Sequence, residues 1–269
     1  NGMHFIFGLG SAFAPLILAG FLARTGNIQG PFWILTILCL PLIFWFWINP
    51  KTPRPQKLNG KKETVPPMLP LVLITLAFTF YVGLELGLGS WLYTYTLKLN
   101  LGTVLTAAYL TSAFWGAYTL SRLLGIWIST WIRPQTILMI DILGALASIG
   151  LIILQPNSTL ILWIGTIGSG LFMASIFPTL LIYSSERLPV TGVITSWQLM
   201  GSGSGAMILP WMIGAAFNKL GPTSMPWFLL GSGVLHLISV LLFTGKTANT
   251  PPNPDKYGVQ DLQNPPRIS

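Results

Sequence analysis

The chain has 269 residues, of which 52% are hydrophobic and 7% are charged, and its formal net charge is +8. Soluble globular proteins carry about 25% charged residues, so this composition excludes a soluble protein and predicts one with several membrane spans. The positive charge does not indicate a nucleic-acid partner, because the basic residues lie in the gaps between apolar runs and form no single basic face.

About eight apolar runs are long enough to cross a bilayer, which takes roughly 20 residues of helix. They do not alternate polar and apolar residues as the strands of a membrane barrel do. We therefore expect an all-α, polytopic membrane protein. The expected spans cover residues 4–23, 31–48, 68–96, 103–130, 135–155, 158–184, 190–217 and 225–244.

Residues 49–66 separate the second span from the third and hold five basic residues against one acidic residue. Proline-broken, charged segments of this kind are solvated linkers. Basic residues concentrate on the cytoplasmic side of membrane proteins, so we expect a cytoplasmic linker. The same orientation puts residues 246–269, a proline-rich tail that we expect to be disordered, in the cytoplasm as well.

The first and seventh spans resemble each other. Residues 7–26 align with residues 200–221, with Gly8, Gly10 and Ser11 opposite Gly201, Gly203 and Ser204. A repeat after six helices is typical of a transporter built from two parallel six-helix halves. Residues 1–48 would then be the last two helices of an N-terminal half, and residues 67–245 a complete C-terminal half. About four helices are expected upstream of residue 1.

The third span contains a lone carboxylate, Glu85, flanked by Gly83 and Gly87. A charge at the bilayer centre costs at least about 2.5 kcal/mol, and acids in spans are functional by default. We expect Glu85 to face a central cavity and to bind a proton or a cation. Tyr81 lies one helical turn earlier and is expected on the same face. The alternative is a neutral acid that a neighbouring helix satisfies.

Arg122 and Asp141 lie in consecutive spans on either side of the turn near Arg133. Counting helical turns from Arg133 puts both side chains at a similar depth. A buried cation and a buried anion at one depth are expected to pair, because each is costly alone. We interpret them as a structural bridge or as a gate or part of a relay, and prefer a structural or gating role over contact with the substrate.

Three further side chains within the spans have the chemistry of sugar binding: Trp115, Trp197 and Gln198. Aromatic rings stack on the apolar faces of sugars, and amides hydrogen-bond to hydroxyls. The alternative is plain packing, which accounts for most buried aromatic residues. His236 is interpreted as a satisfied core residue.

Several stretches together resemble a known family. They are Asn1-x-x-His4-x-x-Phe7-Gly8-x-Gly10, the run from Tyr81 through Glu85 and Trp91 to Tyr95, and Phe114-Trp115-Gly116 with Ser121-Arg122. They are similar to the fucose permease and sodium-dependent glucose transporter group of the major facilitator superfamily. The resemblance implies a partial fold of that superfamily and ion-coupled uptake of a sugar or similar small solute by alternating access. Ser121 departs from the glycine expected before the arginine.

The expected function is therefore secondary transport, with a small polar solute and the lipid bilayer as partners. We expect no cofactor beyond a coupling ion, H⁺ or Na⁺, and no catalytic or metal site. The sequence has no GxxxxGK[ST] loop for ATP. Two alternatives stay open: a truncated fragment that transports nothing, and an intramembrane enzyme. The sequence disfavours an enzyme, since it has one cysteine, two distant histidines and neither GxSxG nor HExxH.

Overall fold

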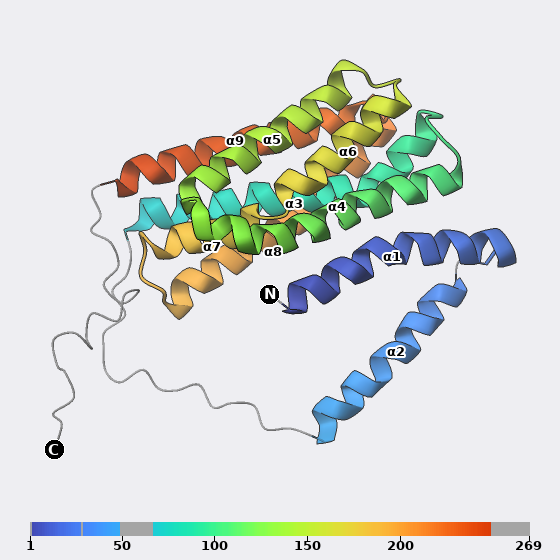
Figure 1. The fold of residues 1–269 in the computed structure, drawn as a ribbon, viewed down its shortest axis with the longest axis horizontal. Coiled ribbons are helices and arrows are strands. Elements are labelled where there is room, and N and C mark those ends of the chain that lie inside the picture. The colour runs from blue at the N-terminus through green and yellow to red at the C-terminus, as the bar shows by residue number, and fades with distance from the viewer. Residues whose placement is uncertain (1, 28, 49–66, 249–269) are drawn as a thin grey trace.

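The structure is a computed structural model of the chain and describes residues 2–27, 29–48 and 67–248. The expected linker at residues 49–66 and the tail beyond residue 248 lie outside the described residues. Within the described ranges every regular element is a helix. The bounds are α1 Gly2–Thr25, α2 Gln29–Ile48, α3 Met68–Lys98, α4 Val104–Trp131, α5 Pro134–Leu154, α6 Thr159–Met173, α7 Ile176–Ser185, α8 Gly192–Leu220 and α9 Ser224–Thr247 (Figure 1).

The helices coincide with the expected spans, and α6 and α7 together fill the sixth. Five segments of the described residues are long and apolar enough to cross a membrane: α3, α5, α6 with α7, α8 and α9. The prediction of an all-α polytopic membrane fold is confirmed.

Helix α3 lies inside the bundle, in contact with α4, α7, α8 and α9 (Figure 1). Its contact with α8 depends on small residues. A Cβ atom at Gly205 would overlap the carbonyl oxygen of Thr79, and one at Gly201 would lie 2.5 Å from the carbonyl oxygen of Thr75. Only glycine allows the two backbones to approach this closely. Because Thr75 and Thr79 face Gly201 and Gly205 in the same order, α3 and α8 run parallel.

Helix α1 packs along α4, whereas α2 contacts α1 and extends away from the bundle (Figure 1). Aromatic side chains of α2 are widely exposed; Trp33 is 67% and Trp47 is 79% accessible. Soluble proteins rarely leave apolar surfaces of this extent open to water. The surface is therefore one that lipid or other apolar helices cover.

The sixth span is broken at Ala174 and Ser175, between α6 and α7. Pro178 explains the break. Its ring nitrogen carries no hydrogen for the carbonyl oxygen of Ala174, four residues earlier, and the ring clashes with that carbonyl. The last carbonyl groups of α6 then need partners from elsewhere. The break differs from the expectation of one continuous span over residues 158–184.

Candidate functional site

The carboxyl group of Glu85 lies in the middle of α3, and its residue is only 8% exposed. It hydrogen-bonds with the hydroxyl groups of Tyr81 and Tyr118, and the charge of Arg122 lies within electrostatic reach. The structure thus brings Glu85 and Tyr81 together, as their helical spacing predicts. Tyr118, on α4, was not anticipated.

The two tyrosine hydroxyl groups link the acid to the broken helix. The Tyr81 hydroxyl donates to the carbonyl oxygen of Met173 at 2.7 Å and lies 3.3 Å from the Tyr118 hydroxyl. A phenol can donate one hydrogen and also accept one. A carboxylate at Glu85 can therefore accept from these hydroxyls, and a protonated carboxyl group can donate to them. The site accommodates both protonation states of the acid.

Arg122 supplies the positive charge of the site. Its Nη2 donates to the Tyr118 hydroxyl at 2.6 Å, and its Nε donates to the carbonyl oxygen of Ala174 at 3.2 Å. The guanidinium carbon lies 4.4 Å from the centre of the Tyr118 ring. Its Nη1 is buried and forms no hydrogen bond with the described residues. A buried cation of this kind needs a nearby anion, and Glu85 supplies one through Tyr118.

The expected direct pair between Arg122 and Asp141 is wrong. Asp141 is 7% exposed and accepts a hydrogen bond of 2.6 Å from the hydroxyl of Ser175. Within the described part of the chain the two charged groups form no ion pair. The reason is the helix break, because Ala174 and Ser175 lie between the two charges and satisfy one each. Arg122 and Asp141 do lie at a similar depth, as expected, because Arg122 binds Ala174 and Asp141 binds the next residue, Ser175.

The broken helix is held by side chains from α3 and α4. Ser121 donates to the carbonyl oxygen of Leu171 at 2.6 Å. Tyr81 and Arg122 bind the next freed carbonyl groups, those of Met173 and Ala174. Helix ends buried in lipid need such partners, since no water reaches them. Ser121, the departure from the family pattern, thus has a structural role here.

Trp115 lies at the edge of the same cluster. It is buried, and its ring centre lies 5.5 Å from that of Tyr118 and 4.9 Å from that of Phe114. A Cβ atom at Gly89 would lie 2.6 Å from the Trp115 ring, so glycine makes room for the indole on α3. Trp115 therefore packs beside the phenols that hold Glu85.

Gln198 and Trp197 lie elsewhere. Gln198 is 5% exposed, and its Nε2 donates to the Ser184 hydroxyl at 2.9 Å. Trp197 packs against the edge of the core. Because Gly201 lies opposite Thr75, Gln198 is about 13 residues, or roughly 20 Å of helix, from the level of Glu85. Gln198 instead lines a hollow of about 280 Å³ between α7 and α8, with Leu181, Ile182, Ser184, Ser185, Leu188, Pro189, Val190, Ile194 and Thr195.

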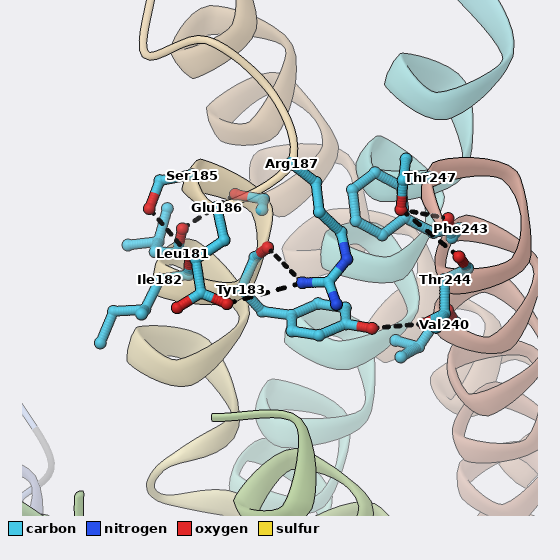
Figure 2. Close-up of polar contacts among 11 residues, drawn as sticks. Leu181, Ile182, Tyr183, Ser185, Glu186, Arg187, Val240, Phe243, Thr244 and Thr247 are labelled. Carbon is cyan, nitrogen blue, oxygen red and sulfur yellow. Dashed lines mark hydrogen bonds and ion pairs between the residues drawn. The ribbon is translucent and has the colours of Figure 1, made fainter. Parts of the chain in front are cut away.

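A second polar cluster closes the end of α7 near this hollow (Figure 2). The guanidinium carbon of Arg187 lies 3.7 Å from the centre of the Tyr183 ring, and its Nη1 donates to the carbonyl oxygen of Tyr183 at 3.2 Å. The same nitrogen lies 3.6 Å from a carboxylate oxygen of Glu186. The Tyr183 hydroxyl lies 2.6 Å from that of Thr244 on α9. This cluster ties α7 to α9.

Three residues of the site were not predicted from the sequence: Tyr118, Ser175 and Pro178. Tyr118 could have been found, since it precedes Arg122 by four residues and so shares its helical face. Pro178 carried a signal as well, because proline inside a span frees a carbonyl group. Ser175 had no local signal, because its role depends on Asp141 from another helix.

Comparison with known proteins agrees with the fold. The family model of the Major Facilitator Superfamily matches residues 2–210, well over half of the chain. The chain belongs to the Major Facilitator Superfamily. The resemblance drawn from the sequence motifs is thereby confirmed, and the chain is an integral, multi-pass membrane protein of a transporter superfamily.

Individual relatives are similar over part of their length. Major facilitator superfamily domain-containing protein 4A of Homo sapiens is 33% identical over 144 residues, covering 53% of this chain and 28% of that protein. Sodium-dependent glucose transporter 1 of Xenopus laevis is 27% identical over 250 residues, covering 80% of this chain and 50% of that protein. Sodium-dependent glucose transporter 1A of Mus musculus is 33% identical over 144 residues, covering 54% and 34%. The chain thus spans half or less of these relatives.

Proposed function

We propose that the chain works as a secondary transporter of a sugar or a similar small polar solute, and that Glu85 binds the coupling ion, H⁺ or Na⁺. The observation that carries this proposal is the buried acid held by two phenols and Arg122 beside a broken helix. Acids inside spans are typical of ion pathways. Broken helices in transporters are typical of substrate and ion sites.

The hydrogen bonds give a route from ion binding to movement. When Glu85 is charged, Tyr81 and Tyr118 donate to it; when Glu85 is protonated, their hydrogens are free for other acceptors. The Tyr81 hydroxyl then shifts between Glu85 and the carbonyl oxygen of Met173. A change at the acid therefore changes what holds the end of α6. Alternating access requires such a difference in contacts between two states.

The names of the relatives support the solute class. Two of the similar proteins are called sodium-dependent glucose transporters, so we carry a sugar-like solute to this chain as part of the proposal. Two six-helix halves, further helices before residue 1, a cytoplasmic linker and alternating access belong to the same proposal. The repeat between residues 7–26 and residues 200–221 supports the two halves and the further helices, and the basic residues of the linker support its cytoplasmic side.

Vesicle uptake tests the proposal. The chain is reconstituted into liposomes, and accumulation of radiolabelled glucose and fucose is measured under a pH gradient and a sodium gradient imposed separately. We expect accumulation above the outside concentration under at least one gradient, and its loss in Glu85→Gln. Glu186→Gln is the matched control, because it makes the same change in an acid at the end of α7. Accumulation by Glu85→Gln equal to that of the wild type contradicts the proposal.

A second candidate is a fragment that transports nothing by itself. It is favoured by one observation: the chain spans only 28% to 50% of the relatives described above. A two-half transporter with only two helices of one half lacks part of the lining of its cavity. The same uptake assay, run on this chain and on the longest reading frame that contains it, separates the two. Uptake by the longer protein alone would show that this chain does not transport by itself.

A further inference from the structure

The oxygen atoms beside Glu85 already have partners. A sodium ion in a transporter is held by several oxygens, often the carbonyl groups of an unwound helix. Here the carbonyl oxygen of Ala174 accepts a hydrogen bond from Arg122, and that of Met173 accepts one from Tyr81 whenever Tyr81 does not donate to Glu85. The hydroxyl oxygen of Tyr118 accepts another from Arg122. The broken helix therefore presents its carbonyl groups to donors of the protein itself.

The guanidinium group of Arg122 also occupies the C-terminal end of α6, beside Glu85. The C-terminal end of a helix carries a partial negative charge, which attracts cations. At the end of α6 the guanidinium group of Arg122 meets that charge, bound to Ala174 and lying over the Tyr118 ring. Arginine does not lose its proton in proteins, so this charge is permanent. A second cation, such as a metal ion, meets repulsion there as well as a shortage of free oxygen ligands.

We propose that Arg122 makes the Glu85 site selective for protons over sodium ions. The inference rests on the proposed role of Glu85 as the ion-binding group. A proton needs no shell of oxygen ligands, because it bonds to one carboxylate oxygen and is then donated to a neighbouring hydroxyl. The hydroxyl of Tyr81, which Arg122 does not bind, is placed to accept it.

The other helices packed around Glu85 bring no closer charged group to it among the described residues. From α9, the His236 ring lies 5.8 Å from the Tyr81 ring, and its Nδ1 donates to the carbonyl oxygen of Ala77 at 2.8 Å. At this level α8 presents Leu209 and Ile213 to the glycines that flank Glu85, and α7 presents Phe177 to Tyr81. Asp141 of α5 binds Ser175 on the other side of the break. The described charged group nearest the acid thus comes from α4.

Infrared spectroscopy tests the selectivity without a transported solute. The absorption of the protonated Glu85 carboxyl group is assigned by its loss in Glu85→Gln, and it is then titrated with pH in KCl and in NaCl of equal ionic strength. We expect the same midpoint in both salts. Sodium that competes for the site would lower the apparent proton affinity in step with its concentration. A sodium-dependent shift of the midpoint in the wild type overturns the proposal.

Arg122→Gln tests the cause of the selectivity. This variant removes the positive charge and leaves the carbonyl oxygen of Ala174 without its guanidinium donor. We expect the Glu85 titration to become sensitive to sodium. Arg187→Gln is the matched control, since it removes a stacked arginine at the end of α7, and it should stay insensitive. An Arg122→Gln protein that inserts normally and stays insensitive overturns the role of the guanidinium. If it does not insert, the wild-type titration decides.

The outcomes separate this inference from the proposed function. An absence of solute uptake under any gradient counts against transport but leaves the infrared result intact. Uptake that depends on Glu85 and is driven by a sodium gradient supports transport and overturns proton selectivity. Uptake driven by the pH gradient alone supports both.

Discussion

Two arginines of this molecule have the same local geometry and different surroundings. Arg122 and Arg187 each follow a tyrosine by four residues and stack on its ring, at 4.4 Å and 3.7 Å. Arg187 then binds the carbonyl oxygen of its own Tyr183 and lies near Glu186, where both side chains are partly exposed. Arg122 reaches across to the carbonyl group at the end of another helix, close to Glu85.

The comparison teaches that the local spacing provides the stacking and the neighbouring helices provide the role. Near the Arg187 cluster, the polar contact between α7 and α9 is a pair of neutral hydroxyls, those of Tyr183 and Thr244 (Figure 2). Near Arg122, a freed carbonyl group and a buried acid come from two other helices. We therefore interpret the first as a structural tie and the second as part of an ion site.

Replacing each of the two arginines should give the largest difference in stability. Arg122→Gln should lower the free energy of unfolding by about 3–5 kcal/mol, because it leaves an acid buried without its countercharge. Arg187→Gln should cost about 1 kcal/mol or less, as expected for a partly exposed pair. Thermal unfolding of both variants in detergent measures the difference. Equal losses of stability would remove the basis of the comparison.

The tyrosines should differ by a smaller amount. Tyr118→Phe removes a hydroxyl that bonds to Arg122 and Glu85, and hydrogen bonds to charged groups contribute about 1.5–3 kcal/mol each. Tyr183→Phe removes a neutral bond to Thr244, with a cost of about 0.5–1.5 kcal/mol. Denaturation of the two variants under the same conditions tests the order. A larger loss of stability for Tyr183→Phe than for Tyr118→Phe would contradict our view that the bonds around Arg122 and Glu85 are the stronger ones.

The serines at the two ends of α7 extend the comparison. Ser175→Ala removes the donor to the buried Asp141 and should cost about 1.5–3 kcal/mol. Ser185→Ala removes an exposed bond to the carbonyl oxygen of Ile182 and should change stability by about 0.5 kcal/mol or less. Urea titration of the reconstituted proteins distinguishes them. Indifference to Ser175→Ala would show that Asp141 finds another partner.

Pro178→Ala should have the smallest effect on stability and a clear effect on structure. Alanine supplies an N–H group that can bond to the carbonyl oxygen of Ala174, which Arg122 now occupies. The gain for the helix offsets the loss for Arg122, so the melting temperature should change little. Amide hydrogen exchange should show a protected N–H at position 178. Rapid exchange there would indicate that something other than proline holds the break open.

Much of the fold follows from the sequence, because lipid leaves few options. The length of the apolar runs predicts the helices, and glycines such as Gly201 and Gly205 predict the close contact of two of them. Tyr81 and Glu85 share a face because of their spacing alone. Each of these predictions needs only the residue spacing within a single helix.

The contacts between helices could not be predicted in the same way. Arg122 and Asp141 do lie at a similar depth, yet the break at Ala174 and Ser175 stands between them and takes both contacts. Depth alone does not say which groups face each other across a bundle. Gln198 shows the same limit, since a residue suited to sugar binding lies roughly 20 Å along the helix from the acid.

The most direct test of the role of Glu85 compares two modes of transport in one variant. In liposomes, Glu85→Gln should lose gradient-driven accumulation of the labelled sugar and keep exchange of labelled for unlabelled sugar across the membrane, because exchange requires no net movement of the coupling ion. Loss of both modes, in a protein that inserts and unfolds like the wild type, would contradict the account. So would accumulation at the wild-type level.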